Sequence, residues 1–269
     1  LFQRQILIVG DMKKLLGIVV LGLLWCNVGV AGSRIEKLPQ DVVSGDKFSK
    51  ANNKYNTYKK YGMQVVDKKD GHPVRAGNKS IRFEVRAGDC GQSNDFDDCK
   101  TNRERHELSG RGKNSAWLAW SIYLPKDFIH EDSAELCLGQ LYESDGNEDQ
   151  PPWMFMMSKG GYYVNNKTSG PYGETNLLTN EQMLGKWNDI LINVKWSSKV
   201  GFFKIWVNNE LAYDYKGLTK RAAGKVNFKF GIYRYSVFIE DHPTQIVYFD
   251  EVRIGKTKEK VVGNLPPLQ

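Results

Sequence analysis

Three short stretches of the sequence carry polar side chains at every second position, opposite a row of apolar ones. The polar rows are Arg103, Arg105 and Glu107; Gln140 and Tyr142; and Lys229, Tyr233 and Tyr235. Successive side chains of a β-strand point to opposite faces, so each row would lie on one side of a sheet. Guanidinium, amide and phenol groups can bind a carboxylate and move protons. These rows therefore predict a surface suited to acid–base chemistry on an anionic molecule.

The elements that must position these rows are predicted to be strands. Runs rich in Val, Ile, Tyr, Phe and Trp recur between clusters of Gly, Asn, Asp and Pro, and almost no stretch has helical periodicity. The expected strands are 80–86, 105–110, 116–124, 135–142, 153–158, 161–165, 187–196, 201–207, 210–215, 226–235 and 245–254. This pattern predicts an all-β fold, a two-sheet antiparallel β-sandwich of the jelly-roll, concanavalin or lectin-like type.

Two further segments have a predicted place in this fold. Asn208 and Asn209 separate two alternating runs and predict a tight hairpin turn, because Asn tolerates positive φ. The polar stretch 34–60 is weakly patterned and is expected to wrap the outside. In the strand 135–142, alternation places Cys137 on the apolar side, opposite Gln140.

The first 31 residues predict a secretory signal peptide. Met12-Lys13-Lys14 is a short basic start, an apolar run covers 15–25, and Gly29-Val30-Ala31 places small residues where a signal peptidase reads. We expect 1–11 to be upstream read-through, 12–31 to be signal peptide and 32–269 to be a single domain, secreted or periplasmic. The apolar run is shorter than the roughly 20 residues of a spanning helix, so no stable membrane insertion is expected after cleavage.

The charge and the cysteines fit an exported protein. The chain has a net charge of +7, and residues 1–31 hold three basic and one acidic side chains, so the rest carries +5. A modest positive charge favours acidic partners without choosing among them. An acidic polysaccharide, and no nucleic acid, is expected from the family resemblance described below. Cys90 and Cys99 bracket a polar loop and predict a local disulfide, while Cys137 predicts a buried free thiol.

No metal site or required cofactor is predicted. The spacings of Cys and His that bind zinc are missing. Asp250 and Glu251, in the last expected strand, could contribute to a structural calcium site, because hard cations choose carboxylate oxygens.

The polar rows also resemble a known family. Arg105-His106-Glu107-Leu108 is similar to the Arg-x-Glu-Leu strand of β-jelly-roll polysaccharide lyases. Gly139-Gln140-Leu141-Tyr142 resembles their Gln-x-His strand, and Lys229-Phe230-Gly231-Ile232-Tyr233 resembles their Lys-x-Gly-x-Tyr strand. The resemblance covers about residues 80–255 and is greatest to the heparin lyase I and glucuronan lyase-like group.

This resemblance implies an exported lyase that cleaves a uronic-acid-containing polysaccharide, such as glucuronan, alginate or a heparin-like chain. β-Elimination would leave unsaturated uronate ends. Gln140 and Arg105 would bind the substrate carboxylate, since preorganised donors at developing charge are usually the largest catalytic term. Tyr233 would transfer protons, and cationic neighbours such as Lys229, Arg105 or Arg234 are expected to lower its pKa towards the phenolate.

The sequence departs from the family at one catalytic position. Tyr142 stands where related enzymes often carry a histidine base. Either Tyr233 acts as both base and acid, or Tyr142 is the base and Tyr233 the acid. A third interpretation is a non-catalytic carbohydrate-binding protein of the same fold. A monomer is expected, and the predicted substrate-binding residues are Lys229, Arg103, Glu107, Arg234, Tyr235, Trp153 and His72.

Overall fold

The structure is a computed structural model of the chain. It describes residues 35–51, 59–92, 97–130, 134–143, 151–168, 173–221, 223–235 and 241–263. The predicted signal peptide and the residues before it lie outside this described part. Among the described residues, none belongs to a helix with the length and apolar character needed to cross a membrane.

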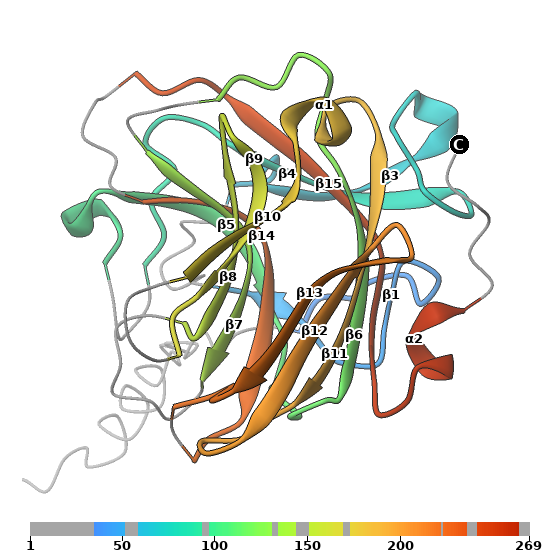
Figure 1. Cartoon of the computed structure of the whole chain (residues 1–269). Helices are drawn as coiled ribbons and strands as arrows, with labels where there is room; N and C mark the ends of the chain where they lie inside the picture. The colour runs from blue at the N-terminus through green and yellow to red at the C-terminus, as the bar shows by residue number, and fades with distance from the viewer. Residues whose placement is uncertain are drawn as a thin grey trace, which may run out of the picture. The chain divides into compact units, whose positions relative to one another are not determined.

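The described chain forms two sheets that face each other (Figure 1). The seven-stranded sheet has the order β10 (Gly173–Leu178), β9 (Gly161–Asn166), β8 (Trp153–Ser158), β7 (Glu135–Glu143), β14 (Val226–Tyr235), β5 (Arg103–Ser109) and β2 (Ser49–Lys50). The eight-stranded sheet has the order β13 (Glu210–Gly217), β12 (Gly201–Val207), β11 (Trp187–Lys195), β6 (Trp117–Tyr123), β15 (Gln245–Gly255), β4 (Lys79–Val85) and β3 (Met63–Asp67). Its last member, β1 (Val43–Ser44), pairs with β15 in parallel.

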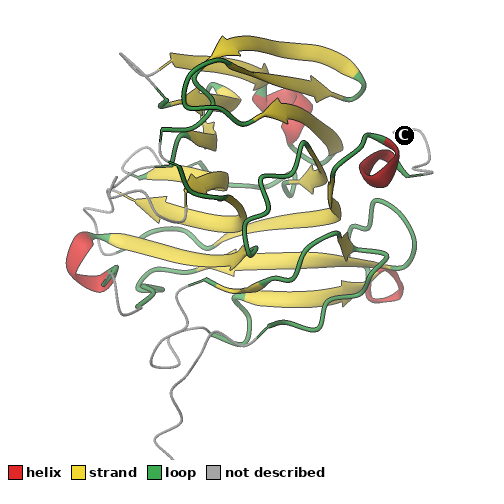
Figure 2. Cartoon of the chain, turned by 90° about the horizontal axis from the view of Figure 1, so that it is seen from below, coloured by secondary structure: helices red, strands yellow, loops and turns green. Residues whose placement is uncertain are grey.

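In the described part of the chain, the helices outside the strands are single turns (Figure 2). These are η2 (Lys68–Asp70), η3 (Cys99–Thr101), α1 (Asn180–Met183) and α2 (Glu259–Val262). The predicted all-β sandwich is thus confirmed.

Aromatic side chains fill the space between the sheets. Trp120 of β6 packs edge-on against Phe155 of β8 and stacks on Phe228 of β14, each with ring centroids 4.9 Å apart. Phe83 of β4 meets Phe230 of β14 at 5.7 Å. Full burial of such a side chain is worth about 1.5–3 kcal/mol. This core uses the apolar row of each strand and leaves the opposite row of the seven-stranded sheet outside the sandwich.

All of the expected strands are present. The strands that were not predicted lie where the alternation of polar and apolar residues is weak. β3 and β10 were not predicted, because both have several exposed positions and little alternation of burial. Asn208 and Asn209 form the predicted turn with φ of 51° and 71°. The prediction that residues 34–60 wrap the outside is wrong for the part of this segment that contains β1.

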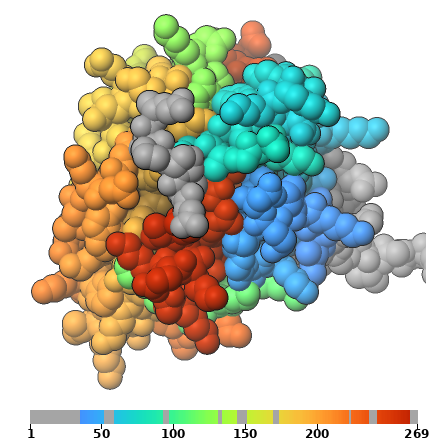
Figure 3. Space-filling view, turned by 90° about the vertical axis from the view of Figure 1, so that its right-hand side faces the viewer, coloured from blue at the N-terminus to red at the C-terminus, as the bar shows by residue number. Residues whose placement is uncertain are grey.

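This N-terminal segment contributes to the core. Val42, Val43 and Phe48 are buried there, and Phe48 packs edge-on against Phe230. In Figure 3 the red atoms of α2 lie between the orange strands and the blue N-terminal segment. Three apolar side chains in a polar stretch are too few to reveal a buried strand from the sequence alone.

An irregularity in β7 changes which side chains share a face. The pairing of β7 shifts between Cys137 and Gly139 against both neighbouring strands. Because a bulge breaks the two-residue period, Cys137 lies opposite Tyr233 and packs with Met156 on the outer face. The predicted buried free thiol is confirmed, but its predicted position on the apolar side is wrong.

Gly231 lets the central strand β14 pass very close to β5. Its φ is +143°, and a methyl group there would lie 2.3 Å from the His106 carbonyl oxygen and 2.8 Å from Glu107 Cα. A side chain therefore fits neither the backbone conformation nor the space.

We expect Gly231→Ala to lower the free energy of unfolding by about 1–3 kcal/mol, the usual cost of a strained backbone site. Urea unfolding monitored by tryptophan fluorescence measures the change. Gly173→Ala is the matched control, because a methyl group at Gly173 meets nothing within 4 Å. Equal stability of the two variants would contradict the close approach of β14 and β5.

Candidate active site

The three predicted polar rows meet on the outer face of the seven-stranded sheet. They come from β5, β14 and β7, which are adjacent in that sheet. Tyr233 of β14 pairs with Arg105 of β5, and Lys229 of β14 pairs with Gln140 of β7. Residues far apart in the sequence are thus brought together by strand register.

Arg105 is held by carboxylates on a nearly dry surface, with 7% of its area exposed. Its Nε and Nη2 donate to the two oxygens of Asp98 at 2.7 and 2.6 Å. Nη1 donates to Glu107 at 3.4 Å. The guanidinium carbon lies 3.8 Å from the centre of the Tyr233 ring, a cation–π contact. Arg105 is therefore fixed in both position and orientation.

Glu107 orients the amide of Gln140 across the central strand. Gln140 Nε2 donates to Glu107 Oε1 at 2.7 Å, although their strands are separated by β14. Glu107 lies opposite Gly231 of β14 in the register. An amide oxygen facing the carboxylate would be repelled, so Glu107 selects the amide orientation. Glu107 is fully buried, so the structure gives it an orienting position and not the predicted contact with substrate.

Burial dominates the ionisation of Tyr233. It raises the pKa of the phenol to about 12, while the charges of Arg105 and Arg103 act in the opposite direction. The expected lowering towards the phenolate is therefore wrong. Tyr233 is a neutral phenol at neutral pH, a form that can donate a proton.

Tyr142 lies on the same face with Lys229 as its neighbour. Lys229 Nζ is 4.2 Å from the centre of the Tyr142 ring. Burial lowers the pKa of the Lys229 ammonium, and the charge of Glu107 opposes that shift. The polar residues of this face are referred to together as the Arg105 cluster: Arg105, Glu107, Gln140, Tyr142, Lys229 and Tyr233. The cluster contains two phenols in different surroundings, one beside Arg105 and one beside Lys229.

An aromatic and thioether surface continues from the cluster. The Tyr235 ring lies 5.4 Å from that of Tyr233, and its hydroxyl donates to Glu135 at 2.5 Å. Arg103 is paired with Tyr235 in the register. Met154 and Met156 of β8 pack beside Tyr233. Sequence reasoning missed both methionines, since β8 reads as a continuous apolar run.

Sequence reasoning also missed Asp98. It belongs to the loop closed by Cys90 and Cys99, and the predicted disulfide is confirmed with a Cα–Cα distance of 5.0 Å. Its position next to a cysteine of a local disulfide was the one available signal, because such a loop holds its neighbours firmly.

Three of the predicted substrate-binding residues are not brought to this face. Arg234 points inward and is fully buried, where it pairs with Glu104 at 2.5 Å. Trp153 lies between the sheets, stacked on Phe203 at 3.9 Å. His72 lies in the loop between η2 and β4, where its Nδ1 is 3.3 Å from the hydroxyl of Tyr248 in β15 of the other sheet. These positions correct the corresponding predictions.

The other histidines have surroundings of their own. His106 is buried on the opposite side of β5, with Nε2 3.2 Å from Asp89. The His130 ring packs against Phe128 at 5.3 Å, and His242 is buried. Among the described residues, the phenols on the outer face of the seven-stranded sheet include Tyr233 beside Arg105, Tyr235 beside Tyr233, and Tyr142 beside Lys229.

The two carboxylates considered for calcium bind protein groups. Asp250 accepts from the backbone N–H of Arg75, Ala76 and Glu251, and Glu251 pairs with Arg253. Burial raises the pKa of Asp250 to about 7. Within the described residues, no group of three or more His, Cys, Asp or Glu is arranged to hold a metal ion.

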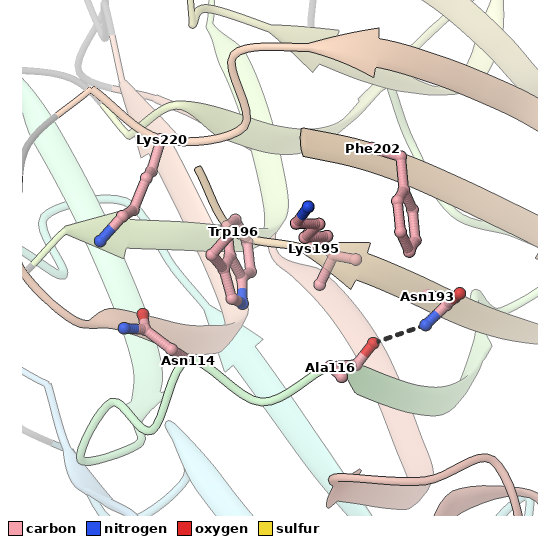
Figure 4. Close-up of a pocket in the computed structure, with 8 residues that line it drawn as sticks. Asn114, Ala116, Asn193, Lys195, Trp196, Phe202 and Lys220 are labelled. Atoms are coloured by element: carbon pink, nitrogen blue, oxygen red, sulfur yellow. Dashed lines mark hydrogen bonds between the residues drawn. The ribbon is translucent and has the colours of Figure 1, made fainter. Parts of the chain in front are cut away.

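A separate hollow lies on the eight-stranded side (Figure 4). Trp196, Phe202, Lys195 and Lys220 line it, and Asn193 donates to the Ala116 carbonyl oxygen at 3.1 Å. Its lining holds no carboxylate, phenol or imidazole that could transfer a proton. The Arg105 cluster is therefore the better candidate for chemistry.

The solved structures that are similar to this chain include alginate lyases. AlgAT5, an alginate lyase of polysaccharide lyase family 7, superposes with a TM-score of 0.52 at 15% identity, covering 81% of this chain and 98% of that one. An alginate lyase of Pseudomonas aeruginosa gives a TM-score of 0.46 at 18% identity, covering 66% of this chain and 83% of that one. No match to a curated protein sequence is found.

The sequence itself matches a family model. The model described as "Polysaccharide lyase" aligns with residues 44–253, a span that includes β5, β7 and β14 with the whole Arg105 cluster. The chain belongs to this polysaccharide lyase family.

Proposed function

We propose that this lyase cleaves a uronate-containing acidic polysaccharide by β-elimination at the Arg105 cluster. One observation carries the proposal. A fixed guanidinium, an oriented amide and a neutral phenol lie together on one face, with Arg105 3.8 Å from the Tyr233 ring and Gln140 2.7 Å from Glu107. These are the groups that elimination next to a carboxylate needs.

The first requirement is to stabilise the carboxylate of the uronate. Removal of the C5 proton builds negative charge on a group that is already anionic. Gln140 gives one amide hydrogen to Glu107 and has a second one to donate. Arg105 adds a positive charge that is already oriented, so little reorganisation is needed when charge develops.

The second requirement is a base and an acid. The base takes the C5 proton, the C4–C5 double bond forms, the C4–O4 bond breaks, and the acid protonates O4. Because burial raises the pKa of Tyr233 to about 12 and so disfavours its phenolate, we assign Tyr233 as the acid. Tyr142 is then the base, with Lys229 beside its ring.

The class of substrate and the cellular location are inferred from features of the chain outside the Arg105 cluster. The net charge of +5 beyond residue 31 favours an acidic polymer. Alginate is the first substrate to test, since AlgAT5 is an alginate lyase; glucuronan and heparin-like chains follow from the finer resemblance to the heparin lyase I and glucuronan lyase-like group. Such polymers are met outside the cytoplasm, in agreement with the signal peptide proposed for 12–31.

One assay tests the proposed reaction. Residues 32–269 are incubated with alginate, glucuronan, heparin and chondroitin, and the ultraviolet absorbance of the new C4–C5 double bond is followed. We expect absorbance with at least one polymer. Binding without absorbance would indicate a non-catalytic carbohydrate-binding protein, and new reducing ends without absorbance would indicate hydrolysis.

We expect Tyr233→Phe to lower kcat by about 10²–10⁴-fold, the usual contribution of a general acid or base, with substrate affinity almost unchanged. Tyr142→Phe should cause a loss of similar size if it is the base. Tyr213→Phe is the control, because its ring stacks near Tyr215 and Trp153 at the eight-stranded sheet. Full activity of the Tyr142→Phe variant would indicate that Tyr233 carries out both proton transfers.

The pH profile separates the two assignments in a second way. An acid with a pKa of about 12 stays protonated as the pH rises and is lost only near pH 12. Between pH 7 and 10 we therefore expect no fall in kcat through Tyr233. A tenfold rise in kcat per pH unit that persists in Tyr142→Phe would identify Tyr233 as the group that must ionise.

A further inference from the structure

The loop closed by the Cys90–Cys99 disulfide is fastened to β5 at both of its ends. Asp89 and Asp98 each lie next to one of the two cysteines. Asp98 binds Arg105, and Asp89 binds His106, the next residue of β5. Because neighbouring residues of a strand face opposite ways, the loop holds β5 from both sides.

The Asp98 end is rigid and dry. Asp98 is fully buried, and its carboxylate takes two hydrogen bonds from Arg105 in a bidentate arrangement. Its backbone N–H donates to the Gly91 carbonyl at 2.9 Å, and the Gly91 N–H donates to Asp98 Oδ2 at 3.2 Å. The Arg103 N–H donates to the Asp98 carbonyl at 3.1 Å. Backbone and side chain of Asp98 are therefore set by the loop itself.

The Asp89 end fixes the loop in register with the strand. Arg105 N–H donates to the Asp89 carbonyl at 2.9 Å, and the Tyr61 hydroxyl donates to the Asp89 carboxylate at 2.7 Å. A shift of the loop along β5 would break these bonds together with the Asp98–Arg105 pair. The loop therefore determines where the guanidinium lies, beyond neutralising its charge.

We propose that Asp98 is a positioning residue for the lyase, which sets the orientation of Arg105 towards the substrate carboxylate, and that the Cys90–Cys99 disulfide holds Asp98 in place. The assignment rests on the proposed function, because it gives Arg105 a part in the reaction. Asp98 is buried beneath Arg105, so it acts through that side chain. Glu107 stays as a second carboxylate partner of Arg105 when Asp98 is changed.

The primary test is Asp98→Asn, which keeps one oxygen acceptor and removes the charge and the second acceptor. We expect kcat to fall about 10²-fold, the effect of misplacing a catalytic group by about 1 Å, with KM near its original value. Asp97→Asn is the matched control in the same loop. Gln92 Nε2 and the Cys99 N–H both donate to Asp97 Oδ1, an acceptor that Asn retains, so activity should not change.

A double-mutant cycle distinguishes positioning from a general loss of stability. If Asp98 acts through Arg105, Asp98→Asn should cause no further loss of kcat in an Arg105→Ala background. Independent, multiplicative losses in the double variant would overturn the proposal. Thermal unfolding of all variants identifies any loss that comes from a smaller folded fraction.

The double variant Cys90→Ser/Cys99→Ser tests the proposed role of the disulfide while Asp98 is unchanged. It also replaces Asp98→Asn as the test if that variant does not fold. We expect a fall in kcat in the same direction as for Asp98→Asn, again with little change in KM. Unchanged kcat in a folded, disulfide-free variant would refute the role of the disulfide.

A readout without turnover separates this proposal from the proposed function. The Arg105 Nε–H signal in a ¹⁵N NMR spectrum, assigned by its loss in Arg105→Lys, should be protected from solvent exchange in the unmodified protein and in Asp97→Asn. It should lose that protection in Asp98→Asn. If no polysaccharide is cleaved but this pattern holds, the proposed reaction fails while Asp98 still positions Arg105. If the signal is equally protected in Asp98→Asn, the positioning proposal fails whatever the activity.

Discussion

Arg105 carries a permanent positive charge on a face of the sheet where only 7% of its surface meets water, and its neighbours are arranged around that fact. Transfer of an ion out of water costs several kcal/mol even after relaxation of the protein. Two unit charges 4 Å apart attract each other by about 4 kcal/mol at an effective dielectric constant of 20. Asp98 and Glu107 both pair with Arg105, and the Tyr233 ring covers the open side of the guanidinium. The two carboxylates are buried as well, and burial raises the pKa of Asp98 although Arg105 opposes that shift.

Each of these partners imposes a condition on the backbone. Asp98 requires the loop closed by Cys90 and Cys99. Glu107 bonds to both Arg105 and Gln140. The glycine between Lys229 and Tyr233 is required by the close approach of β14 to the β5 backbone and to the core ring of Phe83. Local sequence, strand register and electrostatics are consistent with one another at this site.

The outer face of the seven-stranded sheet could be predicted from the sequence because the side chains of a strand alternate between its two faces. Alternation along β5 and β14 correctly placed Arg105, Lys229 and Tyr233 on one side. The same rule puts Arg234 on the other side, and its selection as a substrate-binding residue went against it. Cys137 was misplaced because one irregularity in β7 breaks the period, and such a bulge leaves little trace in composition.

What the sequence could not provide is contact between segments without periodicity. Asp98 lies in a polar loop. The neighbouring cysteine indicates that this loop is held firmly, but it does not indicate that the partner of Asp98 is seven residues further along on a strand. Trp153, which follows two prolines, was predicted to bind substrate. Its indole instead donates to the Thr219 carbonyl inside the sandwich at 2.8 Å. Burial of this kind depends on how the two sheets are stacked, a tertiary property.

The same burial decides how two residues of one type can take different parts in a reaction. Tyr233 is closed in by Arg105, Met154 and Met156, and the loss of hydration outweighs the favourable charges and raises its pKa. Tyr142 is partly exposed beside the Lys229 ammonium. Acid and base of equal chemical type are separated in enzymes by surroundings that treat their charged forms differently. Replacement of a histidine by Tyr142 is then compatible with elimination, provided that the cationic side of the face lies next to the phenol that must lose its proton. Lys229 lies beside Tyr142, with its Nζ 4.2 Å from the centre of the ring.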